Sequence, residues 1–181
     1  LSDKTGTLTC NTMEFFKCSI AGVAYGEGVT EIERAIMQRK GEPLPPKNGD
    51  AIEPSFNFRD KRLENGAWHK RSDADICRGF FRVLGICQTV IPEGNPVPSE
   101  IVYQAESPDE LAFVVAAKRF GFFFKHRSAT TVTVEEEAFN DGRPGTEDVT
   151  YTILNTLEFT SARKRMSVIV KSKNDGRILL F

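Results

Sequence analysis

Alternation between apolar and polar positions is clearest in the second half of the chain. Aromatic, β-branched and other apolar residues gather there in short runs at 122–124, 130–134, 151–159 and 166–170. These runs favour β-strands, because successive side chains of a strand point to opposite faces. The Asn-Asp-Gly triplet at 174–176 is typical of a hairpin turn, so that 178–181 would begin a partner strand. Connections this short predict an antiparallel sheet.

Before these strands the chain contains three segments with helical features. Residues 31–39 form a short helix candidate, and the apolar stretch 111–117 forms another that ends at Gly121. Between them, behind a cap at Ser72 or Asp73, apolar residues recur at helical spacing: Ile76, Phe80, Val83, Leu84 and Cys87. We expect these helices to pack on the sheet, which defines an α+β fold.

The helix that carries residues 111–117 has a complete start signal. Ser107 can act as its N-cap, and Pro108 can take the first helical position. Glu110 follows Ser107 by three residues and is expected to close a capping box. These local signals account for the start of the helix without a bound ligand.

Local composition assigns the remaining segments. Loops or turns are expected where Pro, Gly and Asn collect: 41–54, interpreted as a mobile insertion, 64–66 and 92–98. Residues 17–25 are β-like, and the alternation at Phe56 and Phe58 suggests a further strand. The three glutamates at 135–137 are interpreted as a solvated strand end.

Composition narrows the class of protein. The 181 residues include 24 basic and 25 acidic ones, which argues against a polyanion-binding protein, so no nucleic-acid partner is expected. No apolar run approaches the roughly 18 residues of a membrane span. The four cysteines show no metal-ligand spacing and are interpreted as reduced thiols of a cytosolic domain.

Residues 3–9 read Asp-Lys-Thr-Gly-Thr-Leu-Thr. By themselves they could be a Thr/Gly turn with a solvated aspartate, but the run resembles the phosphorylation motif of the P-type ATPases, membrane pumps that phosphorylate an aspartate with ATP. The resemblance implies that Asp3 is the nucleophile, that Lys4 neutralises phosphoryl charge, and that Thr5 stands where related phosphatases carry a general acid. It also implies that Asp3 and Thr5 bind Mg²⁺, together with phosphorylation-domain residues outside this chain.

Two further motifs resemble the type IV branch of these pumps, the phospholipid flippases. The Ser-Pro-Asp-Glu run at 107–110 is similar to their nucleotide-domain motif, which implies that Glu110 lies near the adenine amino group of ATP. Residues 157–168 are similar to a second segment, which implies that Phe159 stacks on adenine, that Lys164 lies near the phosphates, and that Ser161 is also a nucleotide contact. From the residues alone, Phe159 could instead belong to the core and the Arg-Lys-Arg triplet at 163–165 could be a solvated turn.

Together the motifs predict the domain organisation and the function. Residues 1–16 are expected to be a stub of the phosphorylation domain, and 17–181 a nucleotide-binding domain that is incomplete at its C-terminus. The resemblance implies a cytoplasmic part of an integral membrane protein that binds ATP and Mg²⁺, forms an aspartyl-phosphate and translocates phospholipids. Its partners would be the phosphorylation, actuator and transmembrane domains of the longer chain, with an accessory membrane subunit possible.

Two alternatives stay open at this point. One is the nucleotide-binding domain of a cation-transporting P-type ATPase, and the other is a nucleotide-sensing or interaction module that is never phosphorylated. Residues 10–13 and 18–22 further resemble the plant aminophospholipid-ATPase group.

Overall fold

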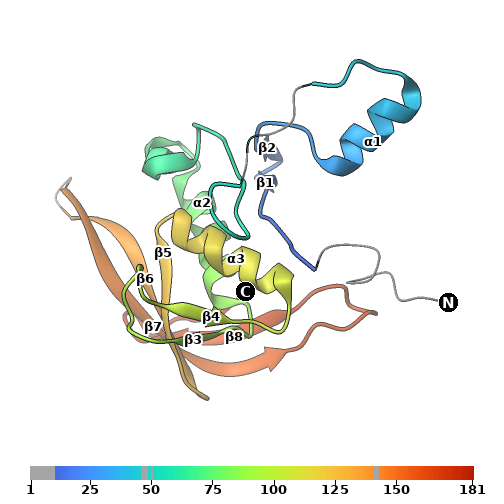
Figure 1. The fold of residues 1–181 in the computed structure, drawn as a ribbon. Helices are drawn as coiled ribbons and strands as arrows, with labels where there is room; N and C mark the ends of the chain where they lie inside the picture. Colours follow the sequence, from blue (N-terminus) through green and yellow to red (C-terminus); the bar gives the residue numbers. More distant parts are fainter. Residues whose placement is uncertain (1–10, 46–48, 50, 141–142) are drawn as a thin grey trace.

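The structure is a computed structural model that describes residues 11–45, 49, 51–140 and 143–181 (Figure 1). A twisted antiparallel sheet occupies the C-terminal half, and its five strands follow one another in chain order. They are β5 (Phe122–Arg127), β6 (Thr131–Asn140), β7 (Arg143–Leu157), β8 (Ser167–Ser172) and β9 (Ile178–Leu180). Neighbouring strands pair antiparallel, as the residue pattern predicted, and the α+β fold class is confirmed.

Two helices pack against one face of this sheet, α2 (Ala74–Ile86) and α3 (Pro108–Arg119). The apolar side chains of that face are buried beneath them: Phe122, Phe124, Val132, Val134, Tyr151, Val168 and Val170. The other face carries partly buried or exposed Thr, Lys and acidic residues, so a single core lies between the sheet and the helices. This packing is what positions the start of α3 and the β7–β8 connection.

The smaller elements surround this centre. They are the hairpin β1 (Cys18–Ile20) and β2 (Val23–Tyr25), α1 (Glu31–Lys40), the 3₁₀ segment η1 (Glu64–Lys70), and the hairpin β3 (Ile91–Glu93) and β4 (Val102–Gln104). The short helix α1 begins with a capping box, in which Thr30 Oγ1 accepts from Glu33 N at 3.1 Å and Glu33 Oε2 accepts from Thr30 N at 2.7 Å. The predicted short helix over 31–39 is therefore confirmed.

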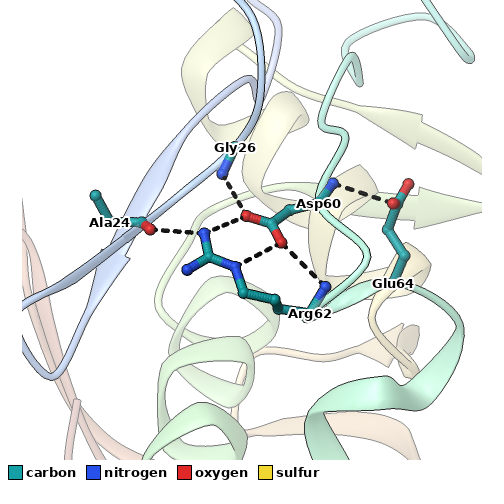
Figure 2. Close-up of polar contacts among 5 residues, drawn as sticks. All are labelled: Ala24, Gly26, Asp60, Arg62 and Glu64. Carbon is teal, nitrogen blue, oxygen red and sulfur yellow. Dashed lines mark hydrogen bonds and ion pairs between the residues drawn. The ribbon is translucent and has the colours of Figure 1, made fainter.

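A buried aspartate fastens the first hairpin to the body (Figure 2). Asp60 is only 3 % exposed, and its carboxylate accepts from Arg62 Nε at 2.9 Å, from Arg62 Nη2 at 2.6 Å and from Gly26 N at 3.0 Å. Arg62 Nη2 also donates to the Ala24 carbonyl at 2.9 Å. The Arg62 hydrogen bonds outweigh the effect of burial and hold the pKa of Asp60 at about 2.

The predicted strand at Phe56 and Phe58 is not present. Both side chains are buried, but the backbone makes only isolated bridges, from Phe56 to Phe15 and to Glu53. Phe15, Phe56 and Phe58 instead form an aromatic cluster with Phe120, at ring-centroid distances of 5.3 to 6.3 Å. Alternating aromatic residues here reflect burial of a loop and not a ladder.

Three other expectations are corrected by the packing. Ile76 of α2 is 53 % exposed, and the buried face runs through Cys77, Phe81 and Leu84, because Phe81 stacks on Phe120 at 4.3 Å. The loop predicted from residue 92 begins later, since Pro92 lies inside β3. Glu136 is not a solvated strand end: it is 2 % exposed and belongs to the core face of β6.

The buried Glu136 carboxylate is neutralised by Arg82 of α2. Arg82 Nε donates to Glu136 Oε1 at 2.8 Å and Arg82 Nη2 donates to Oε2 at 2.6 Å, a two-pronged ion pair. The Tyr151 hydroxyl lies 3.4 Å from Oε1. A charged pair of this geometry can occupy the interior because each carboxylate oxygen is hydrogen-bonded.

Candidate functional site

The predicted catalytic residues Asp3, Lys4 and Thr5 lie outside the described residues, as does the Mg²⁺ site assigned to Asp3 and Thr5. Among the residues that the structure describes, no group of three or more His, Cys, Asp or Glu side chains is arranged to hold a metal ion. The catalytic and metal assignments therefore stay predictions. The four predicted nucleotide contacts, Glu110, Phe159, Ser161 and Lys164, are all described.

Glu110 lies in the first turn of α3, but it does not close a capping box. Ser107 is the N-cap residue and makes no side-chain capping bond, so that part of the prediction is wrong. The Glu110 carboxylate points instead to Thr89 in the turn after α2: Oε1 accepts from Thr89 N at 3.2 Å and Oε2 accepts from Thr89 Oγ1 at 2.7 Å. Thr89 offers two donors to the Glu110 carboxylate, and these bonds form in place of the capping bond.

The turn that carries Thr89 is held by internal hydrogen bonds. Gln88 is fully buried, its Nε2 donates to the Gly85 carbonyl at 3.0 Å, and its Oε1 accepts from Val90 N at 2.6 Å. These bonds satisfy the buried amide and hold the backbone on both sides of Thr89. The turn therefore presents the Thr89 donors to Glu110 from a fixed frame.

A cation and a thiol lie near the same turn. Arg127 of β5 donates from Nη2 to the Ile86 carbonyl at 3.5 Å, and its guanidinium carbon lies 5.8 Å from the centre of the Phe124 ring. Its buried Nε has no hydrogen-bond partner in the described part of the chain. Burial lowers the pKa of Arg127, and the nearby charge of Glu110 opposes this effect.

The thiol, Cys87, lies at the C-terminal cap of α2. Burial raises the pKa of Cys87, and the neighbouring Glu110 charge raises it further. Cys87 also packs against the hydrophobic core that includes Val168 of β8. Because Ser167 precedes Val168 and pairs with Leu157, the base of the β7–β8 loop lies beside this cluster.

The β7–β8 loop, residues 158–166, carries the other three predicted contacts. Phe159 is 62 % exposed, so the alternative that places it in the core is wrong. Ser161 and Lys164 are also exposed, and Lys164 has a left-handed backbone with φ of 55°. In Figure 1 this loop and the start of α3 lie at the same end of the molecule.

Arg163 organises the loop from within. Its Nη1 donates to the Leu157 carbonyl at 3.1 Å and to the Glu158 carbonyl at 3.2 Å, while Nη2 donates to Ser167 Oγ at 3.3 Å. Lys164 N donates to the Thr160 carbonyl at 2.8 Å. Arg163 is thus committed to the loop backbone, which leaves the exposed ammonium of Lys164 and the ring of Phe159 at the surface.

This arrangement has a definite chemical use. An exposed aromatic ring can stack on a flat heterocycle, and an exposed ammonium can form an ion pair with a phosphate. Each Glu110 oxygen accepts one bond from Thr89 and retains a further lone pair for an amino group. Thr89 and Arg127 were missed by reasoning from the sequence, because no local pattern marks a contact between residues 21 positions apart.

Comparison with known proteins gives a consistent result. No established family profile matches the chain. It is 51% identical over 190 residues to "Probable phospholipid-transporting ATPase 12" and 48% identical over 188 residues to "Phospholipid-transporting ATPase 10", both of Arabidopsis thaliana. It is 40% identical over 180 residues to "Phospholipid-transporting ATPase IC" of Xenopus tropicalis.

Each of these matches covers 99% of this chain but only 16%, 15% and 13% of the respective relative. The chain thus spans about a sixth or less of the length of the curated relatives that it matches. In the part of the chain that the structure describes, no helix is both long and apolar enough to cross a membrane.

Proposed function

Because the chain belongs to the phospholipid-transporting, type IV branch of the P-type ATPases, we propose that it is the ATP-binding part of a pump that moves phospholipids across a membrane. The pump would lie in a membrane and this part would face the cytoplasm. The observation that carries the proposal is Phe159, whose ring is 62 % exposed on a loop that Arg163 holds in shape. An exposed ring on an ordered loop is available to stack on the flat base of a nucleotide.

The proposed pocket combines Glu110, at the start of α3, with exposed residues of the β7–β8 loop. Phe159 stacks on adenine, Glu110 accepts a hydrogen bond from the adenine amino group, and Lys164 neutralises phosphate charge. Ser161, exposed on the same loop, supplies a further polar contact. The described side chains fit this ligand in kind: a flat apolar surface, an acceptor with spare lone pairs and an exposed cation.

In the whole protein the bound ATP would be attacked by Asp3. The Asp3 carboxylate takes the γ-phosphoryl group and ADP leaves, so that one hard transfer becomes two easier steps. Lys4, Thr5 and a Mg²⁺ ion would balance the phosphoryl charge, with the ion held by Asp3, Thr5 and residues of the longer chain. The phosphorylation, actuator and transmembrane domains are the partners that this cycle requires.

Labelling of Asp3 tests the proposal. In the full-length protein, Asp3→Asn should abolish the acid-stable phosphoenzyme formed from radioactive ATP and should abolish phospholipid transport, while ATP still binds. Asn keeps the size of the side chain but removes the nucleophilic oxygen. Undiminished labelling of the variant would refute the assignment, and a wild-type protein that binds ATP without ever being labelled would indicate a nucleotide-sensing module instead.

A further inference from the structure

We propose that Thr89 is a positioning residue that orients the Glu110 carboxylate, and that this orientation makes the site select purine nucleotides with a 6-amino group over those with a 6-oxo group. The inference rests on the proposed function of this end of the sheet as a nucleotide pocket. Thr89 itself is not placed against the nucleotide. It acts through Glu110.

The two hydrogen bonds determine the orientation of the carboxylate. One Thr89 donor is the backbone N–H, 3.2 Å from Oε1, and the other is the hydroxyl, 2.7 Å from Oε2. Since the two donors hold different oxygens, they fix the plane of the carboxylate as well as its position. A glutamate side chain on a helix otherwise samples several rotamers, and this freedom would have to be lost when a ligand binds.

The frame behind Thr89 does not depend on Glu110. Gln88 is fully buried and bonded to Gly85 and Val90, so the backbone on either side of Thr89 is held from the core. The backbone N–H of Cys87 donates to the Val83 carbonyl of α2 at 2.9 Å. Thr89 is exposed, whereas its neighbours Gln88 and Val90 are buried, so a change of its hydroxyl leaves this frame intact.

The chemistry explains the selectivity. A carboxylate is an acceptor only, so a 6-amino group can donate to an oriented Glu110 oxygen, whereas a 6-oxo group meets it acceptor to acceptor. Loss of one orienting bond lets the carboxylate turn away, which lowers affinity for the amino ligand. The oxo ligand, which the oriented carboxylate does not favour, loses no affinity. The preference for ATP over inosine triphosphate therefore measures the orientation.

The experiment compares Thr89→Val, which removes the hydroxyl at nearly constant shape, with Thr89→Ser, which retains it. Thr133→Val is the matched control, because the Thr133 hydroxyl is bonded to Thr150 Oγ1 at 3.0 Å on the outer face of the sheet. Affinities for ATP and inosine triphosphate are measured in the full-length protein. Thr89→Val should weaken ATP binding by about 2- to 10-fold, the range expected for freeing one long side chain, and leave inosine triphosphate unchanged. Thr89→Ser and Thr133→Val should match the wild type.

If Thr89 only holds α3 against the turn, a different result is expected. Thr89→Val should then lower the melting temperature and leave the ratio of the two affinities unchanged. That result would overturn the proposal while the nucleotide site stands. A second measurement uses Glu110→Gln: in that background Thr89→Val should no longer change the ratio, and an undiminished effect would also overturn it. A wild-type protein that binds both nucleotides equally refutes the selectivity, and one that binds neither refutes the proposed function with it.

Discussion

Replacing Arg82 by Met removes the guanidinium that neutralises a carboxylate inside the core. Glu136 is 2 % exposed, and it loses hydrogen bonds of 2.8 and 2.6 Å when the guanidinium is removed. Met fills a similar length of the α2 surface without a charge, and the Tyr151 hydroxyl, 3.4 Å from the carboxylate, is the group that stays close. Removing one partner of a buried ion pair costs about 3–5 kcal/mol, so we expect Arg82→Met to lose about that much free energy of unfolding at pH 7.

Urea denaturation at pH 7 measures this loss directly. Trp68, the single tryptophan, is fully buried and reports unfolding by its fluorescence. The control is the double variant Arg82→Met with Glu136→Leu, in which neither charge of the buried pair is left; it should be more stable than Arg82→Met alone. A loss for Arg82→Met below about 1 kcal/mol, or a double variant that is no more stable than Arg82→Met, would refute the reasoning.

Three further substitutions test separate parts of the structure. Phe159→Leu should lower ATP affinity by about 2- to 10-fold and leave the melting temperature unchanged, because the ring is 62 % exposed; a lower melting temperature with unchanged affinity would contradict the stacking role. Asp60→Asn should lower the free energy of unfolding by about 1.5–3 kcal/mol at pH 7. Since the Arg62 hydrogen bonds hold the Asp60 pKa at about 2, this loss should disappear as the pH falls from about 4 through 2. A loss that persists in acid would argue against the ion pair. Gly121→Ala should lower stability by about 1–3 kcal/mol, because φ is 90° and the new Cβ would lie 2.5 Å from Glu137 Cδ, and an unchanged thermal melt would show that this backbone is not strained.

Local pattern was enough to predict the elements of the sheet. The strands after Gly121, the Asn-Asp-Gly hairpin at 174–176 and the helix that begins at Pro108 all follow from periodicity and turn chemistry, which depend on near neighbours. The same is true of the short motifs. Residues 107–110 and 157–168 identified the family and named the candidate contacts before any geometry was known.

The orientation of side chains was decided only by the tertiary structure. Ile76 and Cys77 begin equally regular helical stripes, and contact between Phe81 and Phe120 decided which stripe is buried. Phe159 lies just beyond a strand end, where alternation does not specify a face, and it is exposed.

The polar contacts depend even more on the fold. Glu136 is paired with Arg82, 54 positions away, and Glu110 with Thr89, 21 positions away, so neither pair leaves a trace in the neighbouring residues. Local sequence specifies the conformation of a segment, because near neighbours control its backbone. The partner of a polar side chain is set by which segments the packed core brings together, and that choice belongs to the whole chain.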